Sequence, residues 1–404
     1  MISITGIATG LKTLILFRSV LNEMPIQALI RLDECDPSDA AMVAEAYSGC
    51  TAALWETHDN IGQYVMDCMW KERNRYTDYA LMGIGNSSVL ESLLAREAAI
   101  LEQVARCDGR VYRELAGDAS LPLWETDDTD LLSWYKARVA QIGKTGVGMF
   151  SKHHMFILDD EGALMPIRHP DPQRLSELVG YTTERRQIVA NTEAFLEGKP
   201  ANNVLLYGDA GTGKSSTVKA LANEYAERGL RLVELKKQQL PFIQPLMDRL
   251  AAEPLKFILF IDDLTFTAND TDFCALKAVL EGGVAGRGQN ILVYTTSNHR
   301  HMVKETGADR VGEEISVNDQ LQEIVSLSAR FGLTVTFSRA DKTRYRELVL
   351  GLAAQRGLDV EPDSFMVQAE AFALRSGGRN PRTARQFVDM AEGGMVTYRG
   401  KTES

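Results

Sequence analysis

Residues 203–222 read NVLLYGDAGTGKSSTVKALA and decide the fold of the central part of the chain. The first residues are apolar and predict a short strand, the middle is rich in glycine, and the end has the pattern of a helix. The loop matches the pattern G-x-x-x-x-G-K-[ST] at Gly208, Gly213, Lys214 and Ser215. It also has the strand before it and the helix after it that this pattern requires. We therefore interpret the loop as a cradle for the phosphates of a nucleotide.

Each residue type in this loop has a physical task. Glycines adopt backbone angles that other residues avoid, so successive N–H groups can turn toward phosphate oxygens at the start of a helix. Lys214 is predicted to neutralise the β- and γ-phosphates, and the Ser215 hydroxyl is a hard oxygen ligand suited to Mg²⁺. A glycine-rich turn that contains Lys and Ser by chance is the alternative, and the flanking strand and helix argue against it. The predicted nucleotide-binding residues are Gly208, Asp209, Ala210, Gly211, Thr212, Gly213, Lys214, Ser215 and Ser216.

Length and composition indicate a soluble globular protein. A chain of 404 residues is long enough for two or three domains, and 45% hydrophobic with 25% charged residues is an ordinary composition. No apolar run is long enough to span a bilayer, and the start of the chain lacks the features of a signal peptide. We therefore expect a cytoplasmic protein with no membrane partner.

The five cysteines are widely separated and form no C-x-x-C pair, which predicts free thiols rather than a zinc site or disulfides.

Negative charge is concentrated in the first part of the chain. The formal net charge is −11, and residues 1–170, with 15 basic and 24 acidic side chains, carry −9 of it. Non-specific affinity for nucleic acid comes mostly from Lys and Arg that neutralise phosphates. The N-terminal part is therefore not expected to bind nucleic acid non-specifically, although a local basic patch is compatible with this charge.

Residues 1–143 have a helical pattern and predict a mainly helical N-terminal domain. Asp36-Pro37-Ser38 predicts the start of a helix that runs to Trp55, and Ser88-x-x-Glu91 reads as a capping box before another. A third helix is expected after Asp130. No catalytic constellation is apparent in this domain.

The remainder of the chain predicts an α/β domain. Residues 144–172 are punctuated by Gly and Pro and predict a β-hairpin-like connector. Residues 173–338 alternate strands with helices, which is typical of a parallel sheet covered on both faces, and residues 339–404 are helical in pattern. The five expected strands are Val204–Tyr207, Arg231–Leu235, Phe257–Ile261, Ile291–Thr296 and Leu333–Phe337.

The strand Phe257–Ile261 is followed by two carboxylates, Asp262 and Asp263. The carboxyl ends of parallel strands meet at one edge of the sheet, where the phosphate cradle is also expected. Asp262 is predicted to hold Mg²⁺ through its water shell, and Asp263 to polarise the water that attacks the γ-phosphate. The alternative is an acidic turn that merely ends a strand.

Three further side chains are candidates for the same site. Asn298 follows the strand Ile291–Thr296 and can orient the hydrolytic water from that edge. Arg330 lies just before the last strand, where a solvated arginine at a helix end is the alternative. Arg382 follows Pro381, which suits a first helical turn, so Arg382 is expected near the start of a helix.

The order of these parts resembles the AAA+ P-loop ATPases. By this resemblance the chain has a Walker A segment at Gly208–Ser215, a Walker B segment ending in Asp262 and Asp263, a sensor at Asn298, an arginine finger at Arg330 and a second sensor at Arg382. More narrowly, the segments ANNVLLYGDAGTGKSS, FILFIDDLTF, LKAVLEGG, TTSNHRH and LSARFGL look like a bacterial AAA+ family that is functionally uncharacterised. The resemblance extends from about residue 170 to residue 391.

The resemblance implies binding of ATP and Mg²⁺, ATP hydrolysis in a five-stranded core with a helical lid, and a homo-oligomer. In such an assembly Arg330 would reach the γ-phosphate of a neighbouring subunit. The chain departs from the family pattern at Ala329, where an acidic residue commonly precedes the finger, and at Asn380-Pro381, where Ser-Gly is common. Asp263 stands where Glu is commoner in the family. The Asp side chain is one methylene shorter than that of Glu, which is consistent with slow turnover.

Two uses of ATP are open from the sequence. In the favoured one, the acidic N-terminal part captures a protein client that is then remodelled. In the alternative, the chain is a nucleic-acid-associated switch of the helicase-loader or initiator kind. Residues 236–239, after the second strand, are short and lack an aromatic–hydrophobic–Gly tip, which argues against a threading unfoldase. No added DNA-binding module follows Arg382, which argues against the alternative.

Overall fold

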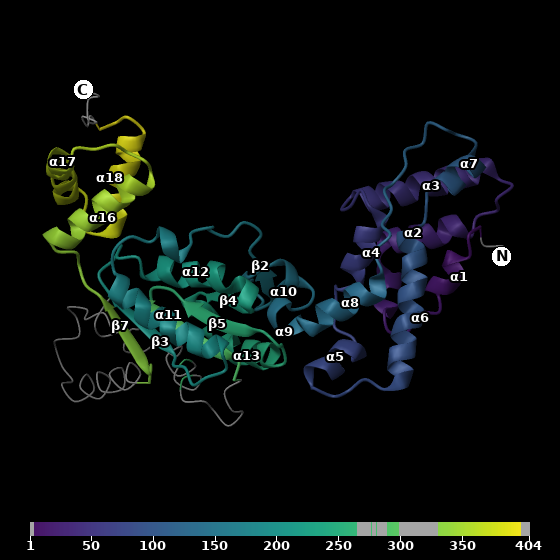
Figure 1. Ribbon diagram of the computed structural model, residues 1–404, viewed down its shortest axis with the longest axis horizontal. Coiled ribbons are helices and arrows are strands. Elements are labelled where there is room, and N and C mark those ends of the chain that lie inside the picture. The colour runs from purple at the N-terminus through teal and green to yellow at the C-terminus, as the bar shows by residue number, and fades with distance from the viewer. Residues whose placement is uncertain (1–3, 265–275, 277–279, 281–288, 299–329, 397–404) are drawn as a thin grey trace. The chain divides into compact units, whose positions relative to one another are not determined.

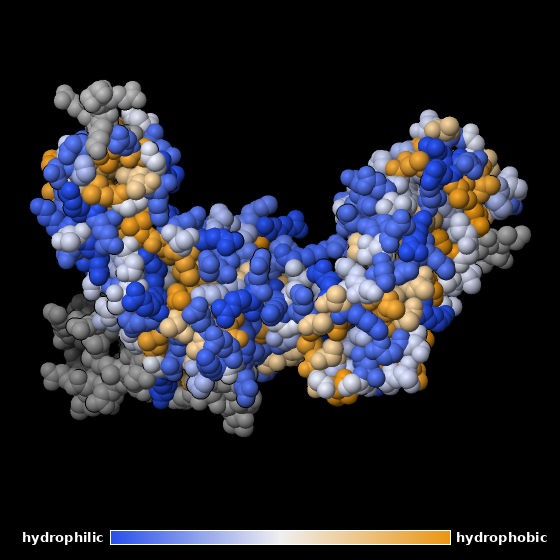
Figure 2. All heavy atoms as spheres, viewed as in Figure 1, coloured by the Kyte–Doolittle hydropathy of each residue, from blue (hydrophilic) through white to orange (hydrophobic). Residues whose placement is uncertain are grey.

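The computed structural model describes residues 4–264, 276, 280, 289–298 and 330–396. The chain divides into two compact units, Met1–Lys152 and His153–Ser404, of which the first is helical and the second contains a sheet (Figure 1). In the view of Figure 2 most of the exposed surface is hydrophilic, with apolar side chains in small groups. Within the described ranges, no helix combines the length and the apolar character that a bilayer-crossing segment needs.

The first unit is built around one hydrophobic core to which most of its helices contribute. Its two longest helices are α3 (Ala40–Trp55) and α6 (Ser88–Ala105). The other elements are α1 (Ile7–Leu11), η1 (Arg18–Asn22), α2 (Met24–Asp33), α4 (Ile61–Met69), α5 (Arg75–Leu81), α7 (Arg110–Ala116), α8 (Leu131–Ala140), α9 (Ile142–Thr145) and α10 (Met149–Lys152). The cysteines Cys35, Cys50, Cys68 and Cys107 are buried and free, whereas Cys274 lies outside the described residues.

Side-chain caps determine where several of these helices begin. Asp39 caps α3 and Asp130 caps α8, each accepting a hydrogen bond from the backbone N–H three residues further on. The predicted capping box Ser88-x-x-Glu91 at the start of α6 does not form. Ser87 is the cap, because its backbone is extended and its side chain accepts from the third backbone N–H after it, whereas Ser88 is already helical.

The second unit contains a seven-stranded sheet in the order β2-β1-β4-β5-β6-β3-β7. All neighbouring strands pair in parallel except β1 and β2, which pair antiparallel. The strands are β1 (Met155–Leu158), β2 (Leu164–Pro166), β3 (Val204–Gly208), β4 (Leu230–Leu235), β5 (Lys256–Ile261), β6 (Ile291–Ser297) and β7 (Leu333–Phe337).

The five strands expected from the sequence all form, but the sheet has two more strands than expected. The additional strands, β1 and β2, form a hairpin in which Ile157 lies opposite Met165. β1 also pairs in parallel with β4, where Phe156 lies opposite Val233. The hairpin is therefore part of the sheet of the second unit. The local sequence does not reveal this pairing, because the partner strand lies far along the chain.

The centre of the sheet is buried on both faces. Every residue of β6 is buried, as are Phe257–Ile261 in β5. Alternate side chains, among them Ile258 and Phe260, pack into a core with α11 (Thr182–Leu196) and α12 (Lys214–Tyr225). Almost continuously apolar strands are typical of parallel sheets that helices cover on both faces. The other elements of this region are η2 (Leu175–Glu177), η3 (Ala226–Arg228), η4 (Lys237–Phe242) and α13 (Ile243–Ala251).

Three helices follow β7 and pack on one another: α16 (Lys342–Gln355), α17 (Pro362–Arg375) and α18 (Pro381–Glu392). We call them the C-terminal bundle. The sequence correctly predicted the start of α18, where Pro381 is the first helical residue and Asn380 caps the helix by accepting from the backbone N–H of Thr383 at 3.0 Å.

Candidate nucleotide-binding site

The predicted phosphate loop connects β3 to α12 at the carboxyl edge of the sheet. Gly208, Gly211 and Gly213 all have positive φ angles, of 133°, 78° and 90°. At Gly208 a Cβ atom would lie 2.1 Å from the carbonyl oxygen of Phe337 in β7, so a larger residue does not fit. Because α12 begins at Lys214, its first N–H groups are available to an anion held by the loop.

The Lys214 side chain is buried, with 5% of its surface exposed. Its Nζ atom donates to the carbonyl oxygens of Gly208 and Asp209, both at 2.8 Å, and to Oδ1 of Asn298 at 2.9 Å. Burial lowers the pKa of Lys214, and the charges of nearby carboxylates, chiefly those of Asp262 and Asp263, oppose that shift. The ammonium group is thus held by oxygen acceptors above a loop suited to phosphates.

Asp262, at the end of β5, lies against the start of α12. Its Oδ1 atom accepts hydrogen bonds from the Ser215 hydroxyl and from the Thr296 hydroxyl, both at 2.6 Å. The oxygens of Ser215 and Asp262 are therefore adjacent. Hydroxyl and carboxylate oxygens are the hard ligands that Mg²⁺ prefers, so the donor chemistry fits the predicted ion.

Asp263 has a left-handed backbone with a φ of 52°, which is uncommon for a residue other than glycine. Thr296 holds this turn, because its hydroxyl accepts from the Asp263 N–H at 2.8 Å and its carbonyl accepts from the Leu264 N–H at 2.7 Å. The Asn298 amide then donates to Oδ1 of Asp263 at 2.6 Å. The turn separates the two carboxylates, so that Asp262 faces Ser215 and Asp263 faces Asn298.

The structure therefore brings five of the predicted site residues together: Lys214, Ser215, Asp262, Asp263 and Asn298. Thr296, which connects Asp262 to the backbone of Asp263, was not among the predicted site residues. A signal was present, because Thr295 and Thr296 place hydroxyls in a strand that is otherwise suited to burial. Buried hydroxyls need hydrogen-bond partners, and such residues at the end of a strand are candidates for a site.

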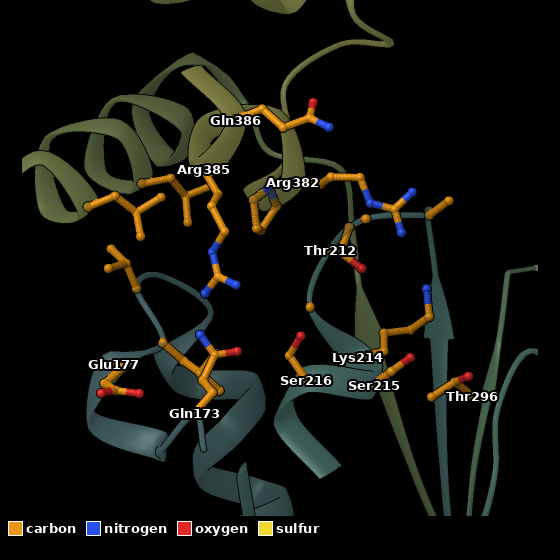
Figure 3. A pocket seen from close by; sticks show the side chains of 18 of the residues that line it. Gln173, Glu177, Thr212, Lys214, Ser215, Ser216, Thr296, Arg382, Arg385 and Gln386 are labelled. Carbon is orange, nitrogen blue, oxygen red and sulfur yellow. The ribbon is translucent and has the colours of Figure 1, made fainter. Parts of the chain in front are cut away.

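A cavity of about 470 Å³ lies over the loop and is also lined by residues of the C-terminal bundle (Figure 3). Ser216 and Arg382 line it together with the five residues above. The backbone N–H of Arg382 donates to the carbonyl of Gly211 at 3.2 Å, which connects α18 to the phosphate loop. Arg330 lies just before β7 and does not line this cavity, and the neighbouring Ala329 lies outside the described residues.

The sequence of the second unit matches a known family. The family is described as "Protein of unknown function (DUF815)", and its profile matches residues 151–395. The chain belongs to this family. The match covers the sheet, the phosphate loop and all of the C-terminal bundle, and it leaves out almost all of the first unit.

Shorter segments of the chain are similar in sequence to other proteins. The chain is 42% identical over 65 residues to the Replication factor C large subunit of Staphylothermus marinus, a segment that covers 16% of this chain and 15% of that protein. It is 44% identical over 66 residues to the same subunit of Thermococcus kodakarensis, covering 16% of this chain and 13% of that protein. The chain thus spans about a seventh of the length of these two curated relatives.

Among solved structures, the chain is similar to the Thermotoga maritima RuvB Holliday junction branch migration motor, with a TM-score of 0.38 and 15% identity over 55% of this chain and 65% of that one. It is also similar to the FIGL-1 AAA domain in complex with ADP, with a TM-score of 0.38 and 13% identity over 57% and 81% of the two chains. The family match and the Replication factor C relatives, together with the motifs, confirm that this chain is an AAA+ P-loop ATPase.

We expect Thr296→Val to slow ATP turnover by about 10-fold or more while ATP binding is retained, because the turn that positions Asp263 loses its hydroxyl support. Turnover and ATP affinity measured separately would check this. Thr295→Val is the matched control, because the Thr295 hydroxyl donates to the Ile261 carbonyl at 2.9 Å and does not contact the carboxylates. Thr296→Ser should restore most of the rate. Equal losses in the Thr296→Val and Thr295→Val proteins would contradict this role.

Proposed function

We propose that this chain binds ATP with Mg²⁺, hydrolyses it, and uses the nucleotide state to remodel a protein client. The observation that carries the proposal is the line of hydrogen bonds from Lys214 through Asn298 to Asp263. It joins a phosphate-binding cation to a candidate base through one amide. A γ-phosphate on the loop would compete for Lys214, so the Asn298 amide is in a position to respond to it.

The residues divide the chemistry among them. The N–H groups of the loop and Lys214 bind the phosphates, and Ser215 and Asp262 hold Mg²⁺, which neutralises phosphate charge when it is bound. Asp263 accepts the proton of the attacking water, and Asn298 orients the Asp263 carboxylate. Residues 339–404, which include the C-terminal bundle, serve as the helical lid, and Arg382 acts from it as a second sensor.

The N-terminal region is the proposed client-binding part, which we take as residues 1–143 with 144–172 as the connection to the ATPase core at 173–338. The first unit, Met1–Lys152, has 14 basic and 21 acidic side chains, a net charge of −7. It lies almost wholly outside the family match. An acidic helical surface is suited to a basic protein segment more than to phosphates.

Lys214→Ala should abolish productive ATP binding, because it removes the mobile charge that can reach both terminal phosphates. Nucleotide-dependent thermal stability is the measurement. A ligand that binds only the folded state stabilises it by about 2.7 kcal/mol at 100-fold excess over its Kd. A Lys214→Ala protein that keeps the full stabilisation by ATP would show that Lys214 has been misassigned.

Asp263→Asn should have a different effect, because the amide keeps the size of the side chain but cannot take up a proton. We expect ATP and Mg²⁺ binding to be retained and hydrolysis to be slowed by roughly 100-fold or more, which is within the usual contribution of a general base. Single-turnover hydrolysis alongside the thermal measurement separates the two effects. Hydrolysis at the rate of the unaltered protein would remove Asp263 from the catalytic role.

Arg330 is proposed to act in trans within a homo-oligomer. Its absence from the lining of the cavity in its own subunit is consistent with this role. An arginine supplied to phosphoryl transfer is worth roughly 10³ to 10⁵ in rate, because its planar fork follows the charge that develops on the phosphate oxygens. Specific activity should therefore rise with protein concentration, and Arg330→Ala should abolish the rise without changing ATP affinity.

Mixing Arg330→Ala and Lys214→Ala proteins tests the same prediction more sharply. One supplies an intact phosphate loop and the other an intact finger, so activity should partly return at mixed interfaces. Activity that is independent of concentration and indifferent to Arg330→Ala would instead favour a monomeric nucleotide switch.

The second candidate is a nucleic-acid-associated ATPase of the helicase-loader or initiator kind. The local identity to Replication factor C large subunits favours it. The negative charge of the first unit argues against it. Filter binding to single- and double-stranded DNA across a salt series separates the two candidates, because phosphate contacts weaken steeply as salt rises.

A further inference from the structure

The arginines of the C-terminal bundle and of the residues that lead into it fall into two groups. Eight arginines lie between residues 339 and 396. Six have hydrogen-bond or ion-pair partners: Arg344, Arg346, Arg356 and Arg379 pair with carboxylates, and Arg339 and Arg375 donate to backbone carbonyls. The guanidinium groups of Arg382 and Arg385 have no hydrogen-bond or ion-pair partner among the described residues. Both of these arginines line the cavity over the phosphate loop.

The side chains of Arg382 and Arg385 extend toward different parts of the cavity. They are three residues apart on α18, so they lie on one face of the helix about one turn apart. Arg382 is connected to the phosphate loop through its backbone, and its charge contributes to lowering the pKa of Lys214. In Figure 3 the Arg382 side chain extends over the Thr212 side of the cavity, whereas the Arg385 side chain extends toward Gln173.

The cavity over the phosphate loop also has apolar lining residues. Leu178 and Val179 line it from the segment before α11, and Leu348 and Leu352 line it from α16. An apolar wall of this kind suits a nucleobase. A nucleotide with its terminal phosphates on the loop and its base at this wall would have its α-phosphate between them, in a cavity that Ser216 and Arg385 both line.

We propose that Arg385 binds the α-phosphate of the nucleotide, while Arg382 acts at the γ-phosphate end. This inference rests on the proposed function and assigns a further phosphate contact within the same site. An α-phosphate is present in ATP, ADP and AMP, so Arg385 contributes to all three. Arg385 therefore holds the C-terminal bundle on the nucleotide before and after hydrolysis, and Arg382 distinguishes ATP from ADP.

The test compares Arg385→Gln, Arg382→Gln and Arg375→Gln by calorimetric titration of the full chain with ATP, ADP and AMP. Arg375→Gln is the matched control, because Arg375 is exposed on α17 and its guanidinium donates to the Ala371 carbonyl. We expect Arg385→Gln to weaken binding of all three nucleotides by a similar factor, roughly 10- to 100-fold, since a charge-assisted hydrogen bond is lost. Arg382→Gln should weaken ATP more than ADP, and Arg375→Gln should change neither.

The outcomes distinguish this inference from the proposed function. If the unaltered protein binds none of the three nucleotides, the proposed function itself fails. If the unaltered protein binds them and Arg385→Gln binds them equally well, only the role of Arg385 fails. A loss confined to ATP would place Arg385 at the γ-phosphate and would overturn its assignment to the α-phosphate.

Discussion

The buried ammonium group of Lys214 is the constraint on which the site depends. A buried charge is costly unless acceptors surround it, and here two loop carbonyls and the Asn298 amide supply them. The two carbonyls belong to the phosphate loop itself, so the lysine holds the loop in its curved form. The third acceptor, Asn298, directly follows β6, the strand next to β3. The same interaction therefore shapes the loop and ties it to the neighbouring strand of the sheet.

The order and register of the parallel strands make that interaction possible. β6 lies between β3 and β5, so residues at its carboxyl end can reach both the phosphate loop and the two aspartates. In the register of the sheet Tyr207 lies opposite Ser297, and Ile261 lies opposite Thr295. Thr296 is consequently beside Asp262, and Asn298 is beside the loop. A register shift by one residue would turn these side chains to the other face of the sheet.

The sequence predicted the parts of this site that depend on local pattern. The phosphate loop, the strands and the start of α18 each carry their signal within a few residues, so the five expected strands could be located without a structure. The pairing of β1 with β4 and the bonds of Thr296 depend on residues far apart in the chain, and no local pattern predicts them. Arg385 was not predicted for a related reason. Whether an arginine is paired with a carboxylate depends on residues far away in the chain, so it is only in the structure that the guanidinium of Arg385 is seen to be unpaired among the described residues.

The phosphate loop is also tied directly to the C-terminal bundle, so a change at the phosphates has a physical route to α18. The Asp209 carboxylate accepts from the backbone N–H of Arg339 at 3.0 Å, and the Gly211 carbonyl accepts from that of Arg382 at 3.2 Å. Arg339 follows β7 closely, and its guanidinium donates to the Gly377 carbonyl at 3.3 Å. A Cβ atom at Gly378 would collide with that guanidinium, so the turn before α18 is closely packed on it. In the proposed function, phosphates draw the N–H groups of the loop inward. This movement acts on the two hydrogen bonds that join the loop to Arg339 and to Arg382. The C-terminal bundle can therefore respond to the phosphates without contacting each of them directly.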